Sequence, residues 1–199
     1  MNNDVFISQD KFIDYLFEDY KKYKFDMLGP NISSPTGESV NPFPALKTEE
    51  EITNNLEKGN KLIKIYNSDV LSFLLDKYLK IKYTFKKRNI PKNGRSLERQ
   101  VPLHGCCIIF SKKYVNKYNG YVFYNNTFLF HEEEFLYQRV LQNNLISIYD
   151  PKIEVFHKEG SSVKKENKSN RKSKLFRERE RINSLNLLKD YINGGYKDE

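Results

Sequence analysis

The chain has 199 residues, of which 38% are hydrophobic and 30% charged, and it contains 14 Tyr and 14 Phe. This length and apolar content fit one domain with a real core and exclude an intrinsically disordered chain. The net charge of +8 favours anionic partners such as phosphates, nucleic acid or lipid headgroups. No apolar stretch approaches about 18 residues and no signal-peptide pattern opens the sequence, so we predict a cytoplasmic protein.

The first quarter of the chain predicts a helix, a strand and a loop, in that order. Ser8 is placed to cap a helix that continues to about residue 22, because apolar residues recur every four positions from Phe12. Residues 26–32 predict a short strand. Residues 33–47 contain three prolines and a glycine, which favour an irregular loop.

The middle of the chain predicts a helix, a basic loop and a buried strand. Apolar spacing predicts the helix over residues 67–81, and the polar residues 86–100 predict the loop. The apolar run of residues 103–110 predicts the strand. It contains the adjacent Cys106 and Cys107, which we expect to be free and buried, because neighbouring cysteines can rarely bridge each other.

The last 90 residues alternate helices with strands, which indicates an α/β fold. Ser111 is expected to cap a short helix that ends at an Asn-Gly pair, and a longer helix is predicted from residue 132 to about 143. Residues 145–157 predict two strands joined by an Asp-Pro turn. Residues 158–181 hold ten Lys or Arg against four Glu, and they predict a solvated loop followed by a helix over 173–192.

Three consecutive acids, Glu132, Glu133 and Glu134, open the helix at residue 132. At about 100° per residue, one apolar stripe of this helix is formed by Leu136, Tyr137, Val140 and Leu141. Glu133 projects near the middle of that stripe, and the other two acids lie toward its edges. One interpretation is that all three acids favour the positive end of the helix dipole. The other is that Glu133, a costly carboxylate at the head of an apolar face, acts as a general base.

His157 ends an apolar strand and also has two interpretations. It can be a histidine that is hydrogen-bonded at a strand end. It can instead be a metal ligand at the edge of the sheet, with an oxygen ligand supplied by Asp4 near the start of the chain. Ligation by Asp and His suits a divalent cation such as Mn²⁺ or Mg²⁺ that bridges a diphosphate.

Five segments of the sequence resemble, in order, the motifs of family 2 glycosyltransferases of bacterial polysaccharide synthesis. The segments are "NNDVFI" (2–7), "LGPNI" (28–32), "VPLHGCCIIFSKKYV" (101–115), "NTFLFHEEEFLYQRV" (126–140) and "NNLISIYDPKIEVFHKEGSS" (143–162). They are similar to the family's Asx-x-Asp segment, its Gly-Pro strand, its His-Gly-Ala strand, its Gly-Glu-Asp segment and its last strand, which ends in histidine. The resemblance covers most of the chain.

This resemblance implies a GT-A-like α/β fold, with a mixed sheet flanked by helices, and an inverting transfer from a nucleotide-sugar donor to a saccharide or lipid-linked acceptor. It implies Glu133 as the base, Glu132 as its neighbour in the acidic pair, and Mn²⁺ or Mg²⁺ as the cofactor. The metal ligands would be Asp4 and His157. The substrates would be bordered by His104, Gly105, His131 and Arg139. Two positions depart from the family, because His131 replaces a glycine and Glu133 replaces an aspartate.

In this family a nucleotide-binding segment precedes the Asx-x-Asp motif, whereas here Met1 stands directly before it. We therefore expect an N-terminally truncated, acceptor-side half of such an enzyme. Residues 1–160 would be the partial catalytic domain, and residues 161–199 a basic loop and C-terminal helical tail. Retained strands without their parallel neighbours would leave a long exposed sheet edge, so we expect self-association into a homo-oligomer.

Two rival functions remain open at this point. The chain can be a non-catalytic remnant or interaction protein that keeps part of the fold. It can also be a nucleic-acid-binding module that uses residues 158–181, although no recognised nucleic-acid motif accompanies these residues and we expect no nucleic-acid partner. Within the glycosyltransferase interpretation, the same basic segment would hold the protein peripherally against anionic headgroups at the inner membrane face.

Overall fold

The computed structural model describes residues 1–35, 39–46, 48–85, 96–127, 130–158 and 171–194, and it divides the chain into two compact units. The first unit consists of Met1–Ala45, Ile90–Asn126 and Glu132–Gly160, and the second of Leu46–Asn89, Thr127–His131 and Ser161–Glu199. Residues 46–89 and 127–131 therefore group with the C-terminal segment in the second unit. Parts of the predicted loops and of the basic segment, namely 36–38, 47, 86–95 and 159–170, lie outside the described residues.

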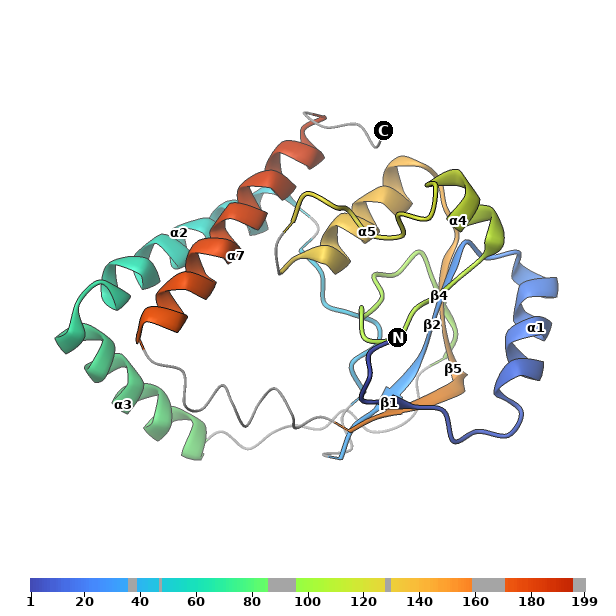
Figure 1. Cartoon of the computed structure of the whole chain (residues 1–199), viewed down its shortest axis with the longest axis horizontal. Helices are drawn as coiled ribbons and strands as arrows, with labels where there is room; N and C mark the ends of the chain where they lie inside the picture. The colour runs from blue at the N-terminus through green and yellow to red at the C-terminus, as the bar shows by residue number, and fades with distance from the viewer. Residues whose placement is uncertain (36–38, 47, 86–95, 128–129, 159–170, 195–199) are drawn as a thin grey trace. The chain divides into compact units, whose positions relative to one another are not determined.

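The first unit is built on a mixed sheet. Its strands are β1 (Val5–Phe6), β2 (Met27–Ser33), β3 (Glu98–Arg99), β4 (Ile109–Phe110) and β5 (Ser147–His157). The order is β1-β5-β2-β4 (Figure 1), and β3 also pairs with β5. Strands β2 and β5 are parallel and every other pair is antiparallel. The expected α/β fold with a mixed sheet flanked by helices is confirmed.

Helices cover both faces of this sheet, namely α1 (Phe12–Tyr23), α4 (Lys112–Lys117) and α5 (Glu132–Gln142). Neighbouring strand residues point to opposite faces, so Leu28 and Ile148 enter one core cluster while Met27 and Tyr149 enter the other. The first cluster contains Phe12 and other side chains of α1. The second contains side chains of α4 and α5, so α1 and α5 lie on opposite sides of the sheet (Figure 1).

Two predicted boundaries are wrong near the start and the end of the first unit. Helix α1 begins at Phe12 rather than after Ser8, because the Gln9 side chain instead bonds to strand β5, donating to Lys152 O and accepting from Glu154 N. Strand β5 is one strand of 11 residues rather than two. Its register with β2 shifts between Pro30 and Asn31, and this irregularity accommodates the Asp-Pro pair without a break in the strand.

The predicted strand over residues 103–110 is reduced to Ile109–Phe110. Side-chain hydrogen bonds replace the ladder in the preceding residues: His104 N donates to Asn41 Oδ1 and Cys106 N to His104 Nδ1. Cys106 and Cys107 are free and buried there, as expected. The Ser111 cap of α4 is confirmed by a bond from Tyr114 N to Ser111 Oγ.

The expected long exposed edge is not found along the described strands. The outer side of β5 pairs with β3 at Ile148 and Tyr149 and with β1 at Phe156 and His157. On β2, the far side pairs with β4, and Ser33 forms a bridge with Ser39. Self-association stays a prediction, but an open edge does not support it.

The second unit contains three helices: α2 (Glu49–Tyr66), α3 (Asp69–Phe85) and α7 (Arg171–Ile192). Helices α3 and α7 correspond to predicted helices. Helix α2 had no predicted counterpart, although its N-terminus is a capping box in which the Thr48 side chain and Glu51 bond each other's backbone N–H groups. In the part of the chain that the structure describes, no helix is long and apolar enough to cross a membrane.

Helix α7 packs along α2 and is held to α3 by ion pairs. Arg171 Nε lies 2.6 Å from Asp69 Oδ1, and Lys174 Nζ lies 2.6 Å from Asp76 Oδ1. Arg181 pairs with Glu178 on α7 itself. These three cations belong to the basic segment 158–181, so part of its charge is used inside the second unit.

Candidate functional site

The N-terminus of α5 and the His-Gly segment before β4 meet through one hydrogen bond. Gly105 N donates to Glu133 Oε1 at 3.0 Å, although the two residues are 28 positions apart. A Cβ atom at position 105 would lie 2.8 Å from the same oxygen, so only glycine allows this approach. The structure therefore brings together two segments that the sequence comparison treated separately.

The helical-wheel prediction placed the wrong carboxylate on the buried face of α5. Glu134 is 4% exposed, whereas Leu141 is 44% exposed. Every residue from Glu134 to Val140 is buried, since neighbouring segments surround this part of the helix, and a single stripe does not describe such a helix. Glu132 and Glu133 are half-buried. Partial accessibility suits a base, because the carboxylate must reach a substrate proton.

The residues that lead into α5 have left-handed backbone conformations. The φ angle is 75° at Phe130 and 67° at His131, in a region where glycine is favoured and histidine is tolerated. Position 131 is where the resembled family has glycine. The departure at His131 therefore changes the side chain while the backbone keeps a glycine-like conformation.

His104 is held in place through both its backbone N–H and its imidazole ring. Its N–H donates to Asn41 Oδ1 at 2.7 Å, and the Asn41 side-chain amide donates to Pro30 O at 2.9 Å. Its Nδ1 accepts from Cys106 N at 3.2 Å, which places the proton of a neutral imidazole on Nε2. The ring also contacts Phe43 edge-on. Asn41 is fully buried and ties the His-Gly segment to strand β2.

Asp4 and His157 face each other where β1 pairs with the end of β5. Asp4 Oδ1 lies 3.2 Å from His157 Nε2, and the two side chains are 33% and 17% exposed. Two ligands that bind one octahedral ion at about 2.1 Å and at right angles lie about 3 Å apart, so this pair fits two positions of a divalent cation. Among the described residues, no group of three or more His, Cys, Asp or Glu side chains is placed to hold a metal.

Cys106 lies between Glu133 and the Asp4–His157 pair. Asn2 N donates to Cys106 O at 2.8 Å, two residues before Asp4, and Gly105 on the other side bonds to Glu133. Burial, then the charges of Cys107, Asp4 and Glu133, raise the pKa of the Cys106 thiol to about 12. Two carboxylates therefore act on the same thiol, which stays protonated at neutral pH and is unsuited to act as a nucleophile.

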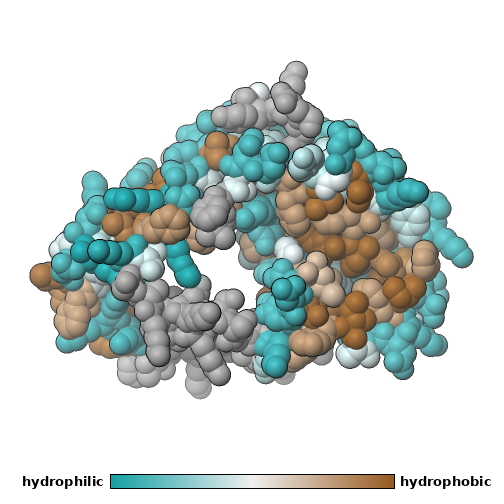
Figure 2. Space-filling view, in the orientation of Figure 1, coloured by the Kyte–Doolittle hydropathy of each residue, from teal (hydrophilic) through white to brown (hydrophobic). Residues whose placement is uncertain are grey.

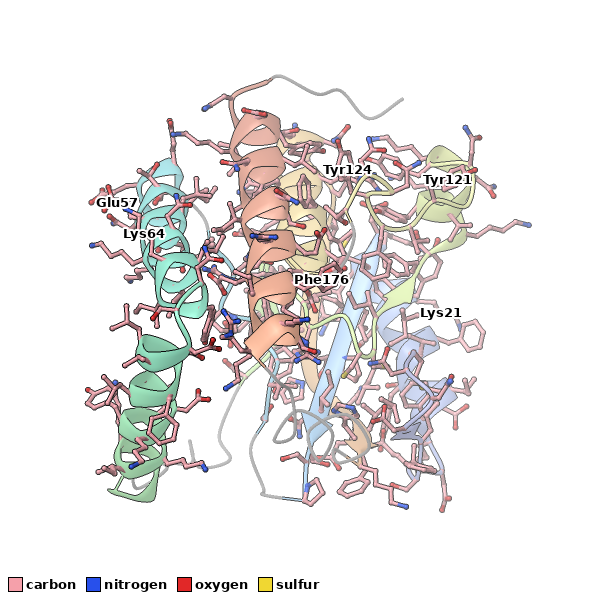
Figure 3. All side chains as sticks on the ribbon, turned by 60° about the vertical axis from the view of Figure 1, so that its left-hand side comes forward. Lys21, Glu57, Lys64, Tyr121, Tyr124 and Phe176 are labelled. Carbon is pink, nitrogen blue, oxygen red and sulfur yellow. The ribbon has the colours of Figure 1, made fainter. Side chains whose placement is uncertain are left out.

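Arg139 lies apart from these groups in the α4–α5 packing. It is buried, and its Nη1 donates to Tyr114 Oη at 3.0 Å and to Tyr121 O at 3.2 Å. Its guanidinium also stacks 4.2 Å from the centroid of the Tyr118 ring. The loop that contains the labelled Tyr121 and Tyr124 can be followed in Figure 3. These contacts give Arg139 a structural role in positioning α4 against α5.

A second acidic group, which the sequence analysis did not single out, lies between α1 and β5. Asp19 and Asp150 are both buried, and they interact through their carboxyl groups. Burial first, and then the hydrogen bond and charge of Asp150, raise the pKa of Asp19 to about 7. Within the described residues, Asp19 Oδ2 has no hydrogen-bond partner. In the sequence, only the position of Asp19 within its predicted helix could have indicated this pair.

No protein-family model, curated protein or solved structure matches the chain.

Proposed function

We propose that the first unit provides the base and the metal ligands of a glycosyltransferase that transfers a sugar, with inversion, from a nucleotide-sugar donor to a saccharide or lipid-linked acceptor. The observation that carries the proposal is the bond between Gly105 and Glu133 beside the Asp4–His157 pair. These four residues come from four separate segments of the resembled motifs. Their convergence supports a common site and a GT-A-like arrangement of the sheet.

In the proposed reaction Glu133 accepts the proton of the acceptor hydroxyl while the oxygen attacks the anomeric carbon of the donor. The Gly105 N–H orients the Glu133 carboxylate from one side and leaves its other lone pairs to the acceptor. Glu132, at the start of α5, is the second member of the acidic pair. His104, fixed by Asn41 and Phe43, borders the same segment.

Asp4 and His157 would hold Mn²⁺ or Mg²⁺ at the end of β5. When bound, the cation supplies positive charge that stabilises the departing nucleoside diphosphate. The half-buried position of the pair leaves room for oxygen ligands from the donor.

The test is to titrate the full chain with Mn²⁺ by electron paramagnetic resonance, and then to record saturation-transfer NMR with a panel of UDP-, GDP- and dTDP-sugars. We expect one Mn²⁺ site, Mn²⁺-dependent signals from at least one donor, and loss of the site in Asp4→Ala and His157→Ala. Asp14→Ala removes an exposed acid on α1 and serves as the matched control. Absence of Mn²⁺ binding together with silence from every donor would overturn the proposal.

A further inference from the structure

Helix α3 of the second unit presents a broad apolar surface to solvent. Six large apolar side chains on it are between 48% and 68% exposed, namely Val70, Leu71, Phe73, Leu74, Tyr78 and Ile81. At about 100° per residue they occupy one side of the helix. The opposite side contains the buried Ser72 and the half-buried Leu75 and Leu79, which face the rest of the unit. Figure 2 shows hydrophobic atoms among hydrophilic ones on the surface over α3.

Helix α3 has charges of both signs, and its acids differ from its lysines in their partners. Its two acids are both in ion pairs with α7, Asp69 with Arg171 and Asp76 with Lys174. Asp69 keeps an 83% exposed side chain within its ion pair, and the exposed lysines of the helix are Lys77, Lys80 and Lys82. On the helical wheel Lys80 and Lys82 fall at the two edges of the apolar side, and Lys77 lies within it.

Two of these lysines lie over aromatic rings of the same surface. Lys77 Nζ is 4.7 Å from the centroid of Phe73, and Lys82 Nζ is 6.0 Å from the centroid of Tyr78. Long lysine side chains can lay their methylene groups along an apolar surface while the ammonium stays at its polar boundary. The sequence continues after the helix with a further basic run, Lys86-Lys87-Arg88.

Helix α2, the preceding helix of the same unit, has a different outer surface. Its labelled residues Glu57 and Lys64 both point away from the unit in Figure 3, and their charges are opposite. Charged residues of both signs are typical of the solvent-facing side of a helix. On α3, by contrast, exposed aromatic and aliphatic residues lie among exposed lysines, and the exposed Asp69 is paired with Arg171.

We propose that this side of α3 docks on the surface of an anionic lipid bilayer. The apolar residues would enter the boundary between headgroups and acyl chains, and the lysines would contact the lipid phosphates and carboxylates. Charge complementarity favours this occupant over a second copy of the chain, because a symmetric pairing of two α3 surfaces would bring lysines against lysines. The proposal uses different residues from the site in the first unit and does not depend on the reaction assigned there.

The chain contains no tryptophan, which allows a direct test with the full-length protein. Phe73→Trp places a single indole on the docking surface, and Phe17→Trp places one on α1, where Phe17 is also exposed. With vesicles of phosphatidylcholine and phosphatidylserine we expect a blue shift of the emission for Phe73→Trp and none for Phe17→Trp. Equal shifts for the two variants, or no shift for either, would overturn the proposal.

A charge-matched comparison tests the lysines in a co-flotation assay with the same vesicles. Replacing Lys77, Lys80 and Lys82 by Gln should weaken binding on the order of a hundredfold at low salt. Replacing the exposed Lys58, Lys61 and Lys64 of α2 by Gln removes the same charge and should change binding only slightly. Equal losses for both triple variants would show net charge alone at work and would contradict docking through α3.

Light scattering without vesicles tests the alternative occupant. We expect the Phe73→Ser, Leu74→Ser double variant to lose vesicle binding with no change in molar mass. A wild-type dimer that this variant converts to a monomer would overturn the proposal in favour of self-association. Circular dichroism of each variant checks that the helices are intact, and the comparable pair Ile13→Ser, Phe17→Ser on α1 controls for loss of exposed apolar area.

Discussion

Glu133 and Asp19 of the first unit both have a carboxyl group, but the surroundings of the two carboxyl groups differ. Glu133 is half-buried, lies in the first turn of a helix, and accepts a hydrogen bond from the backbone N–H of Gly105. Asp19 is 4% exposed, lies inside a helix, and meets a second carboxyl group, that of Asp150. The first arrangement holds an accessible carboxylate in place, and the second favours a neutral, protonated acid. The comparison teaches that burial and a backbone N–H partner put two carboxyl groups of one unit into different states.

The largest expected effect is on the Glu133 side of the comparison. Glu133→Gln keeps the side-chain volume and can still accept from Gly105 N, but it removes the base. We expect sugar transfer to fall by about 10²–10⁴-fold while Mn²⁺ binding stays unchanged. Release of nucleoside diphosphate, measured with the donor that binds, is the readout. An unchanged rate in this variant would show that Glu133 is not the base.

Gly105→Ala tests whether the position of Glu133 matters as well as its charge. The new Cβ would lie 2.8 Å from Glu133 Oε1 and must displace it. Misplacing a catalytic group by about 1 Å can cost about a hundredfold in rate. We expect that loss in turnover without loss of Mn²⁺ binding, because Asp4 and His157 are untouched. If turnover is unaffected, the Gly105 bond has no catalytic role.

Asn41→Ala should act on stability through the same segment. The substitution removes the partners of two backbone groups, Pro30 O and His104 N. Leaving buried polar groups without partners costs about 1–3 kcal/mol each, so urea unfolding should show a loss of at least that size. Ser39→Ala, which removes a half-buried hydroxyl bonded to Asn31 and Asn41, is the milder comparison. Equal midpoints for Asn41→Ala and the wild type would contradict the assigned contacts.

The smallest expected effect concerns Asp19 and depends on pH. Its pKa is raised from 3.8 to about 7 in the folded protein, so the folded state retains a proton that the unfolded chain has released. Stability should therefore fall as the pH rises from about 4 to about 7 and level off above that window. Asp19→Asn stays neutral and should lack this slope, so its advantage over the wild type should be larger at pH 8 than at pH 5. Urea unfolding at the two pH values measures the difference, and parallel curves would refute it.

Local signals in the sequence predicted several elements correctly because their causes are local. The Ser111 cap and the apolar spacing of the α1 and α3 regions need only neighbours along the chain, and they indicated those helices. The Thr48–Glu51 capping box was an equally local signal that the sequence analysis overlooked. Such local signals cannot indicate contacts between residues that are far apart in the sequence. Gln9 bonds to a strand more than 140 residues away, and that contact moves the start of α1.

The sequence could indicate candidate site residues but not the contacts between them. Ordered motifs indicated Asp4, Glu133 and His157, whereas Asn41, in a proline-containing loop, gave no sign that it would fix the His-Gly segment. The wheel ranked Glu133 above Glu134 for burial, because it could not include segments that pack on α5 from several sides. Burial depends on which segments meet, and this information lies in contacts across the chain.

Gly59, in the middle of α2, sets the axial alignment of α7. A Cβ at this position would lie 2.7 Å from Arg181 Nη2 and 2.9 Å from Ile182 Cγ1, so these residues of α7 occupy the space that a side chain would need. A translation of α7 by one turn, about 5.4 Å, would move other residues against this gap. It would also separate Arg171 and Lys174 from Asp69 and Asp76. One missing side chain on α2 thus helps to determine which cations of a distant helix neutralise the acids of α3.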